Sequence, residues 1–137
     1  MINNKKVTVV LPAYNAAKTL EKTYNELPFD IVDETILVDD ASKDDTAALA
    51  NRIGVNHVII HDQNRGYGGN QKYGYLWAIE NGMDIVVLLH GDGQYAPEEI
   101  PRMVEPILSN TADVVFGSRM MQRSKAIKGG MPLYKFI

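Results

Sequence analysis

The sequence predicts one α/β domain built on a doubly wound, mostly parallel sheet with helices on both faces. Three observations lead to this fold class. Short apolar segments alternate with segments that carry helix signals, the apolar segments lack the polar–apolar alternation of half-exposed strands, and each ends in a polar cluster. A length of 137 residues suits a single domain with a sizeable core.

The predicted strands are the apolar segments, and each is short enough to be a strand of a buried sheet. They lie at residues 7–11, 35–38, 55–61, 84–89 and 113–116. Pro12 ends the first of them, because proline has no N–H to donate to a sheet ladder.

The predicted helices fill the intervals between these strands. They lie at residues 13–27, 44–53, 70–80 and 97–108. Asn15 is the expected N-cap of the first helix, and Gly54 is expected to end the second. Pro97 is expected to begin the fourth, as proline often does. Glycines 66, 68 and 69 are interpreted as a turn before the third.

The composition excludes several classes of protein. A net charge of −3 is unlike the basic surface of a general nucleic-acid binder. The absence of cysteine excludes disulfides and thiolate metal sites. The apolar run at residues 7–11 is too short for a signal peptide or a membrane span. We therefore expect a cytoplasmic protein.

Polar clusters follow the predicted strands, and the carboxyl ends of parallel strands share one edge of a sheet, where ligands bind. Asp92 lies between two glycines directly after the strand at 84–89, and we expect it to bind a metal and the phosphates of a nucleotide. Mg²⁺ and Mn²⁺ are held by one or two carboxylates together with phosphate oxygens. Gly91 would let the backbone approach the phosphates. Tyr14 and Asp40 are candidates for contacts to the base.

Five motifs, in this order, resemble those of family 2 glycosyltransferases, most closely the polyprenyl-phosphate branch typified by dolichyl-phosphate mannose synthase. They are Val9-Val-Leu-Pro-Ala-Tyr-Asn15, Val38-Asp-Asp-Ala-Ser42, Asn64-Arg-Gly66, Asp92-Gly-Gln94 and Phe116-Gly-Ser-Arg119. The resemblance covers residues 7–119 and implies the nucleotide-sugar-binding half of a GT-A fold.

The resemblance implies a role for each matching residue. Pro12 and Tyr14 would line the base pocket, and Val38 and Asp40 would contact base and ribose. Asp92 would take the metal and the diphosphate. Gln94 would face the sugar or the acceptor, and Arg119 would approach the phosphates.

The chain departs from the family pattern at two positions. His90 stands where the family often has the first acid of Asp-x-Asp, and it is expected to ligate the metal or donate to a phosphate. Ala16 stands where the polyprenyl-phosphate branch often has glutamate. The first departure removes one carboxylate from the expected metal site, and the second is a difference from the polyprenyl-phosphate branch.

Each candidate also has a purely structural interpretation. Asp92 can be a solvated turn residue, Arg119 a surface ion pair and Tyr14 a packing residue, while Asp39 is interpreted as structural. The two remaining histidines, at positions 57 and 61, are expected to be strand residues with no chemical role.

Together these features predict an inverting glycosyltransferase that uses a nucleoside-diphosphate sugar, Mg²⁺ or Mn²⁺, and a polyprenyl-phosphate acceptor at the cytoplasmic membrane face. Residues 1–119 would form the nucleotide-sugar-binding domain, and residues 120–137 a basic loop that leads to a missing acceptor-binding portion and can contact the membrane peripherally. Two alternatives stay open: a sugar-nucleotide nucleotidyltransferase, and a nucleotide-binding fragment that is inactive alone.

Overall fold

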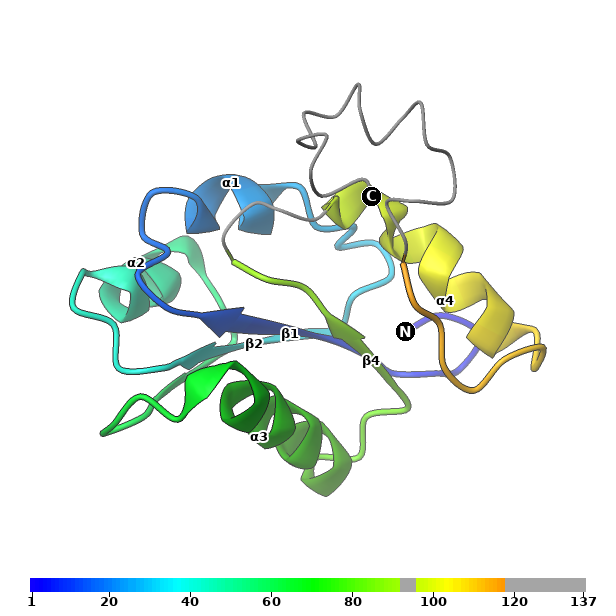
Figure 1. The fold of residues 1–137 in the computed structure, drawn as a ribbon. Coiled ribbons are helices and arrows are strands. Elements are labelled where there is room, and N and C mark those ends of the chain that lie inside the picture. The colour runs from blue at the N-terminus through cyan, green and yellow to red at the C-terminus, as the bar shows by residue number, and fades with distance from the viewer. Residues whose placement is uncertain (92–95, 118–137) are drawn as a thin grey trace, which may run out of the picture.

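The structure, a computed structural model, describes residues 1–91 and 96–117. Within these residues, parallel strands form one four-stranded sheet with helices on both faces (Figure 1), which confirms the predicted fold class. The strands are β1 (Val7–Ala13), β2 (Glu34–Asp39), β3 (His57–Ile60) and β4 (Ile85–Leu88). The helices are α1 (Leu20–Asn25), α2 (Thr46–Ile53), α3 (Gly66–Glu80) and α4 (Ile100–Leu108), with a 3-10 turn at Pro97–Glu99 before α4.

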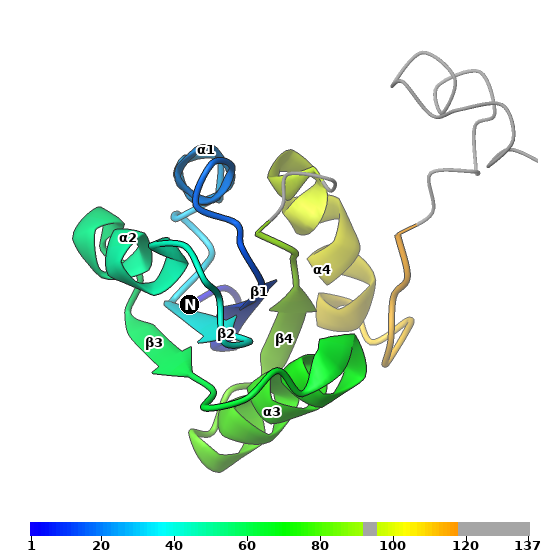
Figure 2. The same ribbon diagram turned by 60° about the vertical axis from the view of Figure 1, so that its left-hand side comes forward.

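The strand β1 is buried on both faces, which explains why its sequence is apolar apart from Thr8, whose hydroxyl donates to the carbonyl of Glu34 at 3.1 Å. Val7, Val9 and Leu11 belong to the core cluster that also holds side chains of α1, α2 and α4. Val10 points the other way, into the smaller cluster with side chains of α3. Figure 2 shows the same division, with α3 alone on one side of the sheet and α1, α2 and α4 on the other.

Helix α3 lies very close to the sheet at Gly74. A Cβ atom added there would lie 2.3 Å from Cγ1 of Val10, so only glycine fits without a shift. Tyr73 and Trp77, the residues on either side of this contact along α3, pack against the same cluster. The close approach fixes the helix against the centre of the sheet.

The strand order is β3-β2-β1-β4, and all neighbouring strands are parallel. The chain moves outward from β1 to β3 and then returns to the opposite side of β1. In open α/β sheets such a reversal opens a crevice at the carboxyl ends of the strands. The fold therefore places a binding site beyond the carboxyl ends of β1 and β4.

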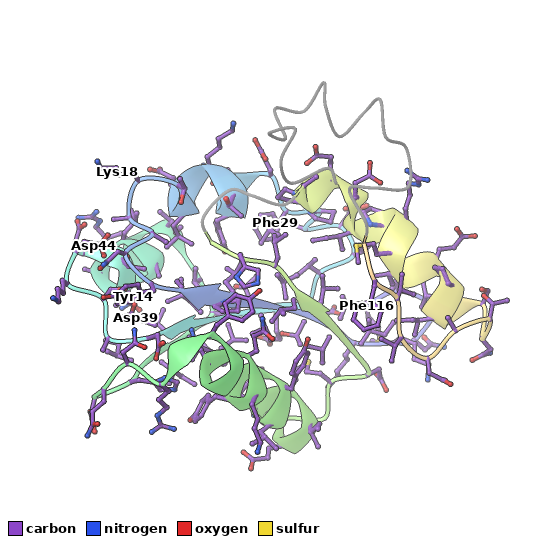
Figure 3. The ribbon with its side chains drawn as sticks, viewed as in Figure 1. Tyr14, Lys18, Phe29, Asp39, Asp44 and Phe116 are labelled. Atoms are coloured by element: carbon purple, nitrogen blue, oxygen red, sulfur yellow. The ribbon has the colours of Figure 1, made fainter. Side chains whose placement is uncertain are left out.

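The strand predicted at residues 113–116 is a wrong prediction, because these residues form no strand. Val114 is 66% exposed and Phe116 is 88% exposed, and Figure 3 shows Phe116 beside α4. A strand needs a neighbour for its ladder, and in the described ranges this segment pairs with none. The apolar composition of a segment does not indicate whether a neighbouring strand is present to pair with it.

The starts of α1 and α3 differ most from the predictions. Helix α1 begins at Leu20, and Asn15 is not its N-cap, because the residues around it bind another loop, as described below. Helix α3 begins at Gly66, four residues before the predicted start at 70, so glycines 66, 68 and 69 lie in its first turn. Gly66 has a positive φ of 76°, which glycine adopts without strain. Helix α2 ends at Gly54 as predicted.

None of the helices in the described ranges is long and apolar enough to cross a membrane.

Candidate functional site

A pocket lies at the carboxyl edge of the sheet and is lined by residues at or beyond the ends of all four strands. Its lining is Pro12, Ala13, Tyr14, Ala16, Asp40, Asn64, Gly66, Tyr67, Asn70 and His90. Its volume is about 260 Å³. Typical small-molecule sites occupy roughly 300–1,000 Å³, so the described residues enclose a space slightly smaller than such a site.

The loop after β1 is fastened to the loop after β2 by consecutive backbone N–H groups. Asn15 N–H donates to Ser42 Oγ at 2.8 Å, and Ala16 N–H donates to Thr46 Oγ1 at 2.9 Å. Ala17 N–H donates to a carboxylate oxygen of Asp44 at 3.2 Å. Because the backbone N–H groups of residues 15–17 bind side chains of residues 42–46, this part of the chain is not helical, and α1 begins only at Leu20.

Asn15 completes this connection from its own side chain. Its Oδ1 accepts a hydrogen bond from the backbone N–H of Lys43 at 2.8 Å, and its φ of 49° lies in the left-handed region. Asparagine tolerates that region better than most residues. The result is a rigid turn that holds the neighbouring Tyr14, which is 49% exposed, at the rim of the pocket.

Asp39 supports the second loop from beneath. It is buried, its carboxylate accepts from the backbone N–H of Ser42 at 3.3 Å, and it also accepts from the Ser42 hydroxyl. Figure 3 shows Asp39 beside Tyr14 at the carboxyl edge, with Asp44 close by and Phe116 at the far side of the sheet. These contacts agree with the structural role that the sequence indicates for Asp39.

Asp44 is the acid whose ionisation is most closely tied to this network. Burial acts against the charge, but the Thr46 hydroxyl and the backbone N–H groups of Ala17 and Thr46 donate to the carboxylate and together hold the pKa of Asp44 below its usual range. The negative charge is thus stabilised at the junction of the two loops.

Asp40 places its carboxylate in the pocket and is itself buried, with a side chain only 5% exposed. Its Oδ1 accepts from the backbone N–H of Arg65 at 2.7 Å and lies 3.4 Å from Nδ1 of His61. Its backbone carbonyl accepts from Asn64 Nδ2 at 3.3 Å. No donor from the described part of the chain reaches Oδ2, so this oxygen is the one left for a ligand.

His90 lies at the end of β4, where its ring is stacked on the ring of Tyr67. The ring centroids are 4.6 Å apart and the planes differ by 7°. The Tyr67 hydroxyl also contacts Nε2 of His90. Nε2 of His90 is therefore engaged with a tyrosine of α3, and a role of His90 as metal ligand stays a prediction.

The described residues do not assemble a metal site by themselves. No group of three or more histidine, cysteine, aspartate or glutamate side chains gathers within residues 1–91 and 96–117. Asp92, Gln94 and Arg119, for which the sequence predicts the metal, sugar and phosphate contacts, lie outside the described residues. Of the acids and histidines predicted for the site, Asp40 and His90 line the pocket.

The other predicted residues occupy two kinds of position. Pro12 and Tyr14 line the pocket. Val38 is fully buried beneath it, and its carbonyl accepts from Asn70 Nδ2 at 2.9 Å. Gly91 is buried as well, and its carbonyl accepts from the Thr19 hydroxyl at 2.7 Å, which fixes the backbone just before Asp92.

Two pocket residues, Tyr67 and Asn70, carry no role in the sequence-based prediction. They are separated by one helical turn on the face of α3 that also carries Gly74. This helical spacing is visible in the sequence, but a helix predicted to begin at residue 70 leaves Tyr67 outside the helix, in a turn. Asn70 is 3% exposed, and its Oδ1 has no hydrogen-bond partner among the described residues.

Several known proteins with similar sequences are sugar transferases. The chain is 35% identical to the UDP-N-acetylglucosamine–dolichyl-phosphate N-acetylglucosaminyltransferase of Methanococcus voltae, over 96% of the chain and 58% of that protein. It is 33% identical to the undecaprenyl-phosphate mannosyltransferase of Micrococcus luteus, over 89% of the chain and 51% of that protein. The chain thus spans little more than half the length of these relatives.

Solved structures show the same fold. Glucosyl-3-phosphoglycerate synthase from Mycobacterium tuberculosis, crystallised with Mn²⁺ and UDP-glucose, matches with a TM-score of 0.64 and 31% identity over 77% of this chain and 40% of that one. The same enzyme has also been crystallised with Mn²⁺, UDP and glucosyl-3-phosphoglycerate. The family model described as glycosyl transferase family 2 matches residues 8–131. The chain therefore belongs to glycosyl transferase family 2 and has the GT-A fold.

Proposed function

We propose that this protein takes part in transferring a sugar from a nucleoside-diphosphate sugar to a polyprenyl phosphate, with inversion at the anomeric carbon. The observation that carries the proposal is the pocket at the carboxyl edge, where Asp40 offers, beside Tyr14, a carboxylate oxygen that no donor from residues 1–91 and 96–117 reaches. The names of the relatives from M. voltae and M. luteus support the choice of acceptor.

In this proposal the described pocket holds the base end of the donor. Oδ2 of Asp40 accepts an N–H of the base, and Tyr14 lies at the rim, where its ring can cover the base. A carboxylate is an acceptor only, so it suits uracil or guanine, whose rings present an N–H edge. The unprotonated ring nitrogen of cytosine is itself an acceptor and would be disfavoured.

The diphosphate then extends from the pocket toward the residues after β4. Asp92 would hold a divalent cation together with the diphosphate oxygens, and Arg119 would contact the phosphates. The solved relative contains Mn²⁺ with UDP-glucose, which supports a divalent cation here. When bound, the cation offsets the negative charge that develops on the leaving diphosphate.

The reaction needs little proton transfer. A phosphate oxygen of the acceptor attacks the anomeric carbon, the bond from that carbon to the diphosphate oxygen breaks, and the nucleoside diphosphate leaves with the bonding electrons. The acceptor is already an anion, so no general base is required. Gln94 would face the sugar or acceptor, and the acceptor would be presented at the cytoplasmic face of the membrane.

A second candidate function is donor binding without transfer. It is favoured because the chain spans only 58% and 51% of the two relatives named above. We expect the 137-residue chain to bind the donor but to need a further acceptor-binding portion for turnover. Sugar transfer to undecaprenyl phosphate by the 137-residue chain alone would contradict this expectation.

The test is a binding panel of UDP-, GDP-, dTDP- and CMP-sugars with Mn²⁺ or Mg²⁺, followed by calorimetry on the best ligand. Asp92→Ala should abolish metal-dependent binding, and Asp40→Ala should reduce discrimination among bases. Asp30→Ala is a matched control, because Asp30 is exposed in the segment between α1 and β2, at the opposite edge of the sheet from the pocket. Unchanged affinity in Asp92→Ala would contradict the proposed diphosphate site.

A further inference from the structure

We infer that His61 is a positioning residue for base recognition, which acts by fixing the carboxylate of Asp40. The inference rests on the proposed function, in which Asp40 accepts an N–H of the base. The histidine follows β3 in the sequence and does not line the pocket, so it would touch no part of the ligand.

The position of His61 is fixed by contacts on several sides. Its backbone N–H donates to the carbonyl of Asp39 at 2.9 Å, which extends the pairing of β3 with β2. Its side chain is only 3% exposed. The ring meets that of Tyr73 edge to face, with centroids 5.2 Å apart and planes at 78°. The imidazole therefore has little freedom to turn away from Asp40.

The contact with Asp40 determines which ring nitrogen of His61 carries the proton. An ionised carboxylate only accepts hydrogen bonds, so Nδ1 of His61, 3.4 Å from Oδ1, must be the donor. The other nitrogen, Nε2, is buried and has no partner among the described residues. A proton on Nε2 would leave a buried donor unsatisfied. The geometry thus favours the tautomer that carries its proton on Nδ1.

This tautomer gives the two oxygens of Asp40 different tasks. Oδ1 receives the backbone N–H of Arg65 at 2.7 Å and the ring N–H of His61. With two donors on Oδ1 the carboxylate cannot rotate freely, and Oδ2 stays directed to the ligand side. Holding a polar group in place before the ligand arrives lowers the entropic cost of binding.

Three substitutions of His61 separate positioning from packing. His61→Asn retains a donor at the same place, because Nδ2 of asparagine and Nδ1 of histidine are both two bonds from Cβ. His61→Gln moves the donor one bond farther out, and His61→Leu keeps an apolar side chain of similar bulk with no donor. Thermal unfolding of each variant first establishes that it is folded.

Calorimetry with Mn²⁺ then compares UDP with N3-methyl-UDP, which lacks the ring N–H. If the panel selects GDP, the pair is GDP and N1-methyl-GDP. We expect His61→Leu to bind the unmethylated nucleotide about tenfold more weakly, the effect of losing roughly one hydrogen bond. It should bind the methylated nucleotide as the parent does. His61→Asn should restore most of the affinity, and His61→Gln should not.

A spectroscopic measurement on the free protein gives an independent readout. The ¹⁵N chemical shifts of the His61 ring should show a proton on Nδ1 and none on Nε2, and this pattern should be lost in Asp40→Ala. A proton on Nε2, or equal affinity of parent and His61→Leu for the unmethylated nucleotide, would overturn the inference and leave the proposed function standing. A parent chain that binds no nucleoside diphosphate would overturn both.

Discussion

Asn15 and Ser42, which are 27 residues apart in the sequence, are joined by a hydrogen bond of 2.8 Å from the backbone N–H of the first to the hydroxyl of the second. Ser42 in turn donates to the buried carboxylate of Asp39. The loop that carries Tyr14 is thereby connected to Asp39 at the end of β2, directly before Asp40. Two parts of the proposed base pocket are thus positioned by one continuous hydrogen-bond network.

This network predicts a graded effect of substitutions at Asn15. Asn15→Ala removes the acceptor for Lys43 N–H and places alanine at a φ of 49°. Each effect costs about 1 kcal/mol, so the free energy of unfolding should fall by about 2 kcal/mol. Asn15→Gly is the control, since it loses only the acceptor and should fall by about half as much. Urea unfolding measures both, and an equal loss in the two variants would show that the backbone conformation contributes nothing.

The lowered pKa of Asp44 predicts how stability depends on pH. Its pKa lies below the ordinary value of 3.8 in the folded protein, so the charged form favours folding. This contribution is complete above pH 3.8 and is lost as the pH falls through the lower, folded value. The difference in unfolding free energy between the parent and Asp44→Asn should therefore shrink as the solution is acidified. A difference that stays constant across this range would contradict the predicted linkage.

Asp33 provides a separate check on this acid response. Burial opposes its charge, but the N-terminal amine and the backbone N–H of Val7 outweigh that effect and lower the pKa of Asp33 as well. Asp44→Asn should thus remove only part of the acid sensitivity. The double variant with Asp33→Asn should remove more of it.

The close contact between Gly74 and Val10 predicts that a normally favourable substitution will be harmful. Gly74→Ala should raise helix propensity, yet its Cβ would lie 2.3 Å from Val10 Cγ1. We expect a net loss of about 1–3 kcal/mol from overpacking. Gly68→Ala is the matched control in the same helix, because nothing lies within 4 Å of its added Cβ, and it should be neutral or stabilising by up to about 1 kcal/mol. Adding Val10→Ala to Gly74→Ala should recover part of the loss.

His90 offers a test of the metal site. A carboxylate two residues before Asp92 would supply a second hard oxygen ligand, which divalent Mg²⁺ and Mn²⁺ prefer over imidazole. We expect His90→Asp to increase the affinity for Mn²⁺ in the presence of nucleoside diphosphate, measured from the signal of free Mn²⁺ in electron paramagnetic resonance. Tyr67→Phe is the control, since it removes the hydroxyl contact to His90 without adding a ligand. An unchanged Mn²⁺ affinity in His90→Asp would contradict the expectation that the side chain of residue 90 coordinates the metal.

The sequence by itself determined the fold class and the region of the site. Continuous apolar runs such as β1 require cover on both faces, and helices between parallel strands provide it. Parallel strands put their carboxyl ends at one edge, so residues at or just beyond these ends come together around one pocket, namely Pro12, Tyr14, Asp40 and His90. These conclusions depend only on periodicity and chain order.

Only the tertiary structure decided which polar groups meet and which apolar segment forms a strand. Whether the segment containing Val114 and Phe116 forms a strand depends on a neighbour that local composition does not specify. The start of α1 depends on acceptors in another loop, more than 25 residues away. The pairing of His61 with Asp40 depends on the side-by-side placement of β2 and β3. Hydrogen bonds between residues distant in the sequence form only when the sheet has packed, so short-range sequence patterns do not predict them.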